Sequence, residues 1–285
     1  MRKSSHPLMH LMVMLVLSLG LFLVASVAFA ALAAGSGEGG RMYNLWMEAA
    51  IQVVVFFLPV VLMTTIYYKG QACEYHRLRF GRNEWLMALA GVVATLLIIP
   101  LNDWLTVWND SWDLGSAGAW LRRQQDSTEG MLEGILTADT VGGLLTNLFV
   151  VALVPAVCEE VFFRAGIQNL LQRWLRNPHV AIWLTAIIFS LGHGEVFSFV
   201  PRFVLGALLG YLYVYSGSIV ANSLAHFVNN ALVVVMYWLS ARGVLGFDPS
   251  EPMCFDWLPT VCCTLAAGGV MWVTFFSNKL KNSTV

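Results

Sequence analysis

Residues 141–164 read VGGLLTNLFVVALVPAVCEEVFFR, and this stretch indicates how the whole chain is built. It carries no charge before Glu159. An apolar run of about 20 residues is long enough to cross a hydrocarbon core about 30 Å thick as a helix. Glu159, Glu160 and Arg164 follow among apolar neighbours, where burying a charge is expensive. The stretch therefore predicts a transmembrane helix that ends in a polar site.

The composition extends this prediction to the rest of the protein. Of 285 residues, 58% are hydrophobic and 12% are charged, whereas about 25% of residues are charged in soluble domains. The charges cluster between long uncharged runs, as in proteins that cross a bilayer several times. This pattern excludes a nucleic-acid-binding module, a disordered chain and a secreted disulfide scaffold, and the five cysteines form no even set that a disulfide framework would need.

We predict an all-α, polytopic membrane protein with about eight transmembrane helices. The eight apolar segments are Pro7–Ala34, Leu45–Tyr68, Trp85–Trp108, Val141–Ile167, His179–His193, Val200–Tyr215, Ile219–Ser240 and Trp257–Ser277. The fifth and sixth are short, so a re-entrant or broken pair is an alternative there. A cleaved signal peptide is the alternative for the first, although its apolar run exceeds the usual 7–15 or so residues of a signal core.

The distribution of positive charge predicts the orientation. With the N-terminus inside, eleven of the 16 Lys and Arg residues fall on the cytoplasmic side, where such residues are enriched in membrane proteins. We therefore expect a multi-pass protein of the cell (inner) membrane with both termini cytoplasmic. The polar stretch 109–139 is the longest loop and lies on the other side, either as a cap over the outer mouth of a cavity or as a plain connector.

Polar side chains on three predicted helices favour a shared site. Glu160 and Arg164 have the i, i+4 spacing of an ion pair, which lowers the cost of burying both. Glu159 points about 100° away from Glu160 and has no local partner, as expected of a general base in an apolar pocket. His193 ends the fifth segment. His226 and Asn230 share one face of the seventh, while Asn229 points elsewhere. We expect a cavity reached from the cytoplasmic half, with Glu159 a few residues from the cytoplasmic end of its helix.

Three short motifs carry a resemblance to a known family. They are Glu-Glu-x-x-x-Arg at Glu159, Glu160 and Arg164, Phe-x-x-x-His at Phe189 and His193, and His-x-x-x-Asn at His226 and Asn230. In this order they resemble the motifs of the CPBP family of CAAX proteases and bacteriocin-processing enzymes, also called the Abi family, which includes the Ras-converting CAAX endopeptidase. The motif region, about residues 141–238, covers roughly a third of the chain.

The resemblance implies an intramembrane endopeptidase with a catalytic cavity inside the membrane. Glu159, aided by His193, would activate water, and His226 with Asn230 would stabilise the oxyanion. Supporting roles fall to Glu160, Arg164 and Phe189. The resemblance also implies the organisation: residues 1–140 hold the N-terminal helices and the outer loop, residues 141–240 the catalytic core, and residues 241–285 the C-terminal loop, the last helix and a short tail.

The partners follow from the same resemblance. The short loops resemble those of bacterial members of the family, so we expect a peptide or membrane-protein substrate entering from the cytoplasmic side, in contact with the lipid bilayer and with no nucleic acid. A prenylated CAAX substrate is not expected for a bacterial member.

The sequence leaves two alternatives to a cofactor-free protease open. A zinc-dependent form of the same protease would hold Zn²⁺ with Glu159, His193 and His226, and Asn230 would be a poorer ligand. We prefer no cofactor, because the chain has no His-Glu-x-x-His motif and a ligating Glu159 would leave only Glu160, paired to Arg164, as base. The other alternative is a non-catalytic scaffold or a proton-coupled transporter, and the absence of an internal repeat disfavours the transporter.

Overall fold

A computed structural model describes residues 6–36, 40–68, 72–78 and 81–282 of the chain. Within these ranges all regular structure is helical, which confirms the predicted all-α class. The elements of the first half are α1 (Pro7–Ser36), α2 (Arg41–Ile51), η1 (Gln52–Phe57), α3 (Leu58–Tyr67), α4 (Ala72–Tyr75), α5 (Arg82–Leu97), α6 (Ile99–Asp110) and α7 (Gly115–Leu136).

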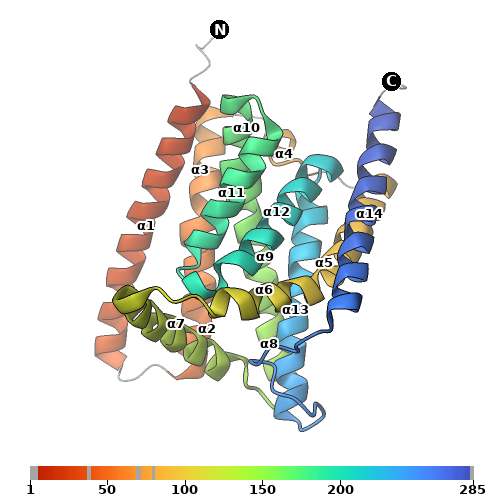
Figure 1. The fold of residues 1–285 in the computed structure, drawn as a ribbon. Coiled ribbons are helices and arrows are strands. Elements are labelled where there is room, and N and C mark those ends of the chain that lie inside the picture. The colour runs from red at the N-terminus through yellow and green to blue at the C-terminus, as the bar shows by residue number, and fades with distance from the viewer. Residues whose placement is uncertain (1–5, 37–39, 69–71, 79–80, 283–285) are drawn as a thin grey trace.

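The second half contains the segment that carries Glu159 and Glu160. Its elements are α8 (Val141–Asn147), η2 (Leu148–Leu153), α9 (Val154–Glu160), η3 (Val161–Gln168), α10 (Asn169–Leu175), α11 (Pro178–Gly192), η4 (Val196–Ser198), α12 (Phe199–Ser216), α13 (Ile219–Ala241) and α14 (Trp257–Asn282). The segments η1, η2 and η3 are π-helical and continue the helices around them, whereas η4 is a short 3₁₀ turn. Figure 1 shows the long helices standing side by side as one bundle.

Within the described ranges, six helices are long and apolar enough to cross a membrane, or seven if the bent pair α5–α6 is one span. All eight predicted segments are helical, but two differ from a simple crossing. The third is bent by 44° between Leu97 and Ile99, next to Pro100, which lacks the N–H that a continuous helix needs. The fifth, Pro178–Gly192, has only 15 residues. The multi-pass architecture is therefore shown, and the number eight stays a prediction.

The helix that carries Glu159 is longer than the sequence suggested. It runs from Val141 to Leu175, 35 residues, instead of ending at Ile167. It ends where Arg176 adopts a left-handed conformation with φ 55° and Asn177 caps the next helix by accepting from the N–H groups of His179 and Val180. Our prediction that Glu159 lies near a helix end is wrong, because buried polar residues such as Gln168 and Asn169 continue the helix.

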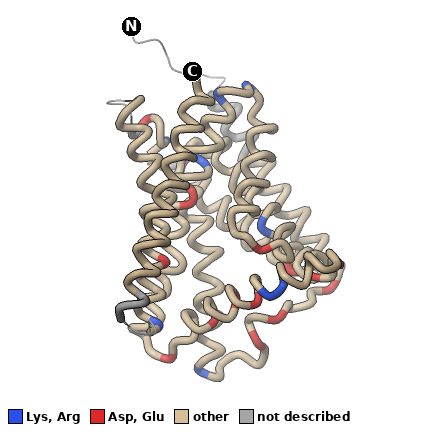
Figure 2. The backbone as a smooth tube through the Cα atoms, turned by 90° about the vertical axis from the view of Figure 1, so that its left-hand side faces the viewer, with Lys and Arg blue, Asp and Glu red and all other residues tan. Residues whose placement is uncertain are grey.

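The two ends of the bundle differ in charge and in structure. The start of α1 and the last turns of α14 lie at one end, and α7 lies across the other (Figure 1). Most charged residues lie toward the ends of the bundle, especially at the end with α7 (Figure 2). The described beginning of α1 and the described end of α14 therefore lie at the same end of the bundle. The cytoplasmic location of both termini stays a prediction.

The stretch predicted as the longest loop is mostly the helix α7, which is anchored at its C-terminal end and near its middle. At its C-terminal end, Arg41 Nε donates to Ile135 O at 2.9 Å, and Asn147 Nδ2 donates to Ile135 O and Leu136 O at 3.2 and 3.1 Å. These bonds satisfy carbonyls that a helix end leaves free. Near its middle, Gln125 holds the turn between α11 and α12, donating to Ser198 Oγ at 3.1 Å and accepting from Phe197 N at 3.2 Å.

Small residues bring α11 and α12 close together. A Cβ atom on Gly210 would lie 2.8 Å from Ile182 Cγ2, and one on Gly206 would lie 3.1 Å from the ring of Phe189. Side chains larger than hydrogen at these positions would push the helices apart, and small residues are common where membrane helices approach closely. The close packing fixes Phe189 and the end of α11, which carries His193.

Candidate active site

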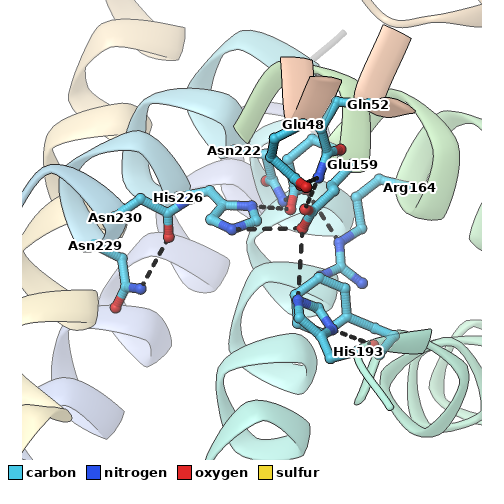
Figure 3. A network of polar contacts seen from close by, with 11 residues as sticks. Glu48, Gln52, Glu159, Arg164, His193, Asn222, His226, Asn229 and Asn230 are labelled. Atoms are coloured by element: carbon cyan, nitrogen blue, oxygen red, sulfur yellow. Dashed lines mark hydrogen bonds and ion pairs between the residues drawn. The ribbon is translucent and has the colours of Figure 1, made fainter. Parts of the chain in front are cut away.

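Two adjacent carboxylates lie near the middle of the long helix, where α9 passes into the π-helical segment η3. Glu160 is fully buried and Glu159 is 6% exposed. Neighbouring residues of a helix point about 100° apart, so the two side chains face different partners (Figure 3). Single π-helical turns are frequent at functional sites because they redirect side chains.

Glu160 is surrounded by hydrogen-bond donors. Arg164 Nε donates to Glu160 Oε2 at 3.1 Å, which is the ion pair that the spacing suggested. Asn222 Nδ2 donates to the same oxygen at 2.8 Å, and His226 Nδ1 lies 3.0 Å from Glu160 Oε1. The buried negative charge is thus compensated by one cation and two further polar groups from α13, as a buried carboxylate requires.

Glu159 has one hydrogen-bonded and one open oxygen. Its Oε1 accepts from Gln52 Nε2 at 3.1 Å. Its Oε2 is buried and has no hydrogen-bond partner among the described residues. This open oxygen lies 4.0 Å from His193 Nε2 and 3.9 Å from His226 Nε2. The separations leave a small gap between a carboxylate and two imidazoles from three different helices.

The other ring nitrogens define how the two imidazoles are oriented. His193 Nδ1 lies 2.8 Å from Phe189 O, and His226 Nδ1 contacts Glu160 as described. Because a carbonyl and a carboxylate oxygen only accept, we assign the proton of each neutral ring to Nδ1. Each Nε2 then presents a lone pair toward Glu159 Oε2. Three lone pairs that face one another favour a proton donor or a cation between them.

Phe189 lies between the parts of the site. Its ring is 1% exposed, and its centroid lies 4.8 Å from that of His193 and 6.0 Å from that of His226. The guanidinium carbon of Arg164 lies 5.3 Å from the same ring centroid. The motif phenylalanine therefore packs against both imidazoles and the buried arginine, and also offers its backbone oxygen to His193.

Asn230 is the predicted site residue that the structure does not bring into this cluster. It follows His226 by one turn of α13 and is half-buried. Its Oδ1 accepts from Asn229 Nδ2 at 3.3 Å. Figure 3 shows both asparagines farther from Glu159 than His226 is. The structure thus joins Glu159, Glu160, Arg164, His193 and His226, with Asn230 at the edge.

Three polar residues of the cluster were missed by the sequence analysis. They are Asn222, whose amide bonds Glu160, and the pair Glu48 and Gln52, which reach Glu159 from the second span (Figure 3). A signal existed for each. Glu48 precedes Gln52 by four residues and Asn222 precedes His226 by four, so each pair shares one face of a predicted transmembrane helix.

Among the described residues, no group of three or more His, Cys, Asp or Glu side chains is arranged to hold a metal ion. Ligand atoms of a tetrahedral zinc lie roughly 3.4 Å apart, given bonds of about 2.0–2.2 Å. The separations of 4.0 and 3.9 Å from Glu159 Oε2 to the imidazoles exceed that value.

The fold and the cluster together define a polytopic helical membrane protein with a buried carboxylate–imidazole site. Residues 141–232 match the family model of type II CAAX prenyl endopeptidase Rce1-like proteins. The match spans all three motifs and confirms the resemblance to the CPBP family of CAAX proteases. It supports, in general terms, a CAAX-type intramembrane endopeptidase, which is a hydrolase. No curated protein and no solved structure matches the chain.

Proposed function

We propose that this protein hydrolyses a peptide bond within the membrane, with Glu159 as the general base. The observation that carries the proposal is the gap between Glu159 Oε2, His193 Nε2 and His226 Nε2, at separations of 4.0 and 3.9 Å from the carboxylate oxygen. A water molecule in this gap donates one proton to Glu159 Oε2 and the other to His193 Nε2. A carboxylate placed so can take a proton from water as the oxygen attacks a carbonyl carbon.

The reaction balances with the residues at hand. Water oxygen bonds to the scissile carbonyl carbon, Glu159 takes one water proton, and the carbonyl oxygen becomes an oxyanion. Collapse of this intermediate breaks the C–N bond, and the proton held by Glu159 passes to the departing amine. A new carboxyl end and a new amino end are the products.

His226 is the donor that we assign to the oxyanion. Its Nδ1 faces Glu160 at 3.0 Å, which fixes the ring with Nε2 3.9 Å from Glu159 Oε2. With a proton on Nε2 as well, this ring is the form of His226 that donates to the oxyanion. Preorganised donors aimed at a developing oxyanion supply a large part of catalysis in acyl-transfer enzymes. Asn230 joins His226 as a second donor once its side chain turns away from Asn229.

Glu160, Arg164 and Phe189 support this arrangement without touching the substrate. Glu160 and Arg164 fix the helix between Glu159 and the cytoplasmic end, and Phe189 holds the two rings. Residues 141–240 then form the catalytic core, residues 1–140 and 241–285 flank it, and both termini lie in the cytoplasm of a cell whose inner membrane holds the protein.

We prefer hydrolysis without a cofactor to the zinc-dependent form. In the zinc form Glu159, His193 and His226 would hold the metal, which would supply a Lewis acid for the water. Glu160 would then be the remaining base, and it is already bonded by Arg164, Asn222 and His226. A zinc-specific chelator should leave activity unchanged, and inhibition that added zinc reverses would overturn this preference.

The substrate is a peptide or the tail of a membrane protein. The family model is named for CAAX prenyl endopeptidases, whereas the short loops of this chain resemble those of bacterial members, for which a prenylated substrate is not expected. Two quenched-fluorescent peptides of one sequence, farnesylated and unmodified, separate these cases when offered to the purified full chain in lipid nanodiscs.

The central test is the Glu159→Gln variant. It should fold normally and lose about 10²–10⁴-fold in turnover of whichever peptide is cleaved. Glu133→Gln makes the same change on the exposed face of α7 and serves as the matched control. Comparing the peptides in membranes that hold active or Glu159→Gln protein identifies natural substrates. Full cleavage by the variant, or full cellular function without cleavage as for a scaffold, would contradict the proposal.

A further inference from the structure

A side chain from outside the family match contacts the candidate base. Gln52 is the first residue of the π-helical segment η1 in the second span, far from residues 141–232 in the sequence. It is 7% exposed and lies against Glu159 (Figure 3). No motif singled out this span, so the contact is information that only the structure supplies.

Both amide protons of Gln52 go to carboxylates. Its Nε2 donates to Glu159 Oε1 at 3.1 Å and to Glu48 Oε1 at 3.4 Å. Its own Oε1 is buried without a hydrogen-bond partner among the described residues. A primary amide has two N–H donors on nitrogen and none on oxygen. A flipped amide would therefore place its oxygen against two carboxylates, so Glu48 and Glu159 together fix the direction of the amide.

The hydrogen bond from Gln52 determines which carboxylate oxygen of Glu159 faces the two imidazoles. Oε1 is engaged by Gln52, so Oε2 is the atom that faces His193 and His226 at 4.0 and 3.9 Å. The donor is a neutral amide, unlike the guanidinium beside Glu160. A neutral donor orients the carboxylate without placing a cation against it.

We propose that Gln52 is a positioning residue for Glu159 and that Glu48 holds the Gln52 amide in its donating direction. The inference rests on the proposed function, since it assigns a role relative to the base. The residues that serve the proposed reaction then include side chains of the second span, in addition to those of the segment that matches the family model. The π-helical turn that begins at Gln52 brings this side chain against α9.

The first test separates turnover from substrate binding. Gln52→Met keeps the length of the side chain and removes both donors, so kcat should fall about 10–100-fold, the effect of one hydrogen bond to a charged group, while KM changes less than about twofold. Gln168→Met is the matched control, because Gln168 is fully buried and its Nε2 donates to a backbone oxygen, Gly210 O, at 3.0 Å. An equal fall in kcat for both variants would overturn the positioning role.

Glu48 provides a graded version of the same test. Glu48→Gln keeps an oxygen that accepts from Gln52, so kcat should stay within about threefold of the wild type. Glu48→Leu removes the acceptor and frees the amide to flip, so kcat should fall by about tenfold. Equal kcat values for the two variants would show that Glu48 does not orient the amide.

A stability cycle tests the contact without any substrate. Gln52→Met should lower the melting temperature in the wild type and have a smaller effect in a Glu159→Leu background, where its acceptor is gone. Gln168→Met should lower it equally in both backgrounds. Additive effects of Gln52→Met and Glu159→Leu would overturn the inference. Loss of turnover in Glu159→Gln together with full turnover in Gln52→Met would overturn the inference and leave the proposed function standing.

Discussion

Glu159 and Glu160 are adjacent in the chain, yet they differ in how many groups bond their carboxylates and in whether one oxygen is left open. Glu160 is bonded by Arg164, Asn222 and His226 and has no exposed surface. Glu159 is bonded by one amide and keeps one open oxygen beside two imidazoles. The 100° turn between neighbouring helical residues lets one helix hold a stabilising cluster on one side and the proposed reactive site on the other.

His226 connects the two sides. Its Nδ1 faces Glu160 at 3.0 Å and its Nε2 faces Glu159 Oε2 at 3.9 Å. The stabilising cluster therefore sets the orientation of a ring that belongs to the reactive site, much as an outer carboxylate orients a histidine in metal sites. Changes on the Glu160 side should reduce stability first, and changes on the Glu159 side should reduce turnover first.

The largest effect is expected on the Glu160 side. Arg164→Met removes the guanidinium bonded to Glu160 and leaves a carboxylate buried at 0% exposure. Breaking one partner of a buried ion pair costs about 3–5 kcal/mol. Unfolding in mixed detergent micelles should show this loss, while Arg123→Met, on the exposed face of α7, should change stability by less than about 0.5 kcal/mol.

A double variant tests whether the uncompensated charge causes this loss. Glu160→Gln combined with Arg164→Met leaves no uncompensated charge, so it should be more stable than Arg164→Met alone. If the double variant is less stable, the bonds of the Glu160 carboxylate to Asn222 and His226 outweigh the cost of its uncompensated charge.

The next effect concerns the edge of the reactive site. Asn230→Ala should lower kcat by about 10²–10³-fold, the typical loss for one oxyanion donor, with little change in melting temperature because Asn230 is only half-buried. Asn229→Ala removes its neighbour and hydrogen-bond partner and is the matched control, expected to retain most activity. Similar kcat values for both variants would remove Asn230 from the oxyanion site.

A smaller loss of stability is expected at Asn222, which ties the Glu160 side to α12. Its Nδ2 donates to Glu160 Oε2 at 2.8 Å and to Leu209 O at 2.7 Å. Asn222→Leu leaves both acceptors short of a donor and should cost about 1–3 kcal/mol. Glu160 keeps Arg164 and His226, so turnover measured below the melting transition should fall less than tenfold. A larger fall in turnover would place Asn222 on the reactive side.

Much of this architecture could be predicted from the sequence. Apolar runs located the six described helices that are long enough to cross a membrane. The i, i+4 spacing of Glu160 and Arg164 predicted their ion pair. The helix end near Ile167 was wrong, because Gln168 and Asn169 look like a boundary in the sequence. Both are buried by bonds to other helices, from Gln168 to Gly210 O and from Asn169 to Tyr75 O.

The parts of the site that the sequence did not predict depend on contacts between distant segments. Gln52 and Glu159 are 107 residues apart, and no local pattern relates them. The gap between Glu159 Oε2 and the two Nε2 atoms likewise depends on how three helices pack. Periodicity specifies which face of a helix a residue occupies, but the partner of that face is set by tertiary packing.

The smallest effect is expected where α7 supports the reactive side from a distance. Gln125 is 4% exposed and holds the turn after His193 by donating to Ser198 Oγ at 3.1 Å and accepting from Phe197 N at 3.2 Å. Gln125→Leu leaves the Phe197 N–H without its acceptor and should cost about 1 kcal/mol. Because the released turn follows His193 directly, turnover should also fall, by about 3–10-fold.

Gln124→Leu, one residue away on the exposed face, is the matched control and should change neither the stability nor the turnover. Faster hydrogen exchange at residues 195–199 in Gln125→Leu would show that the turn, and not α7 itself, has loosened, whereas unchanged exchange and turnover would mean that α7 does not support the reactive side.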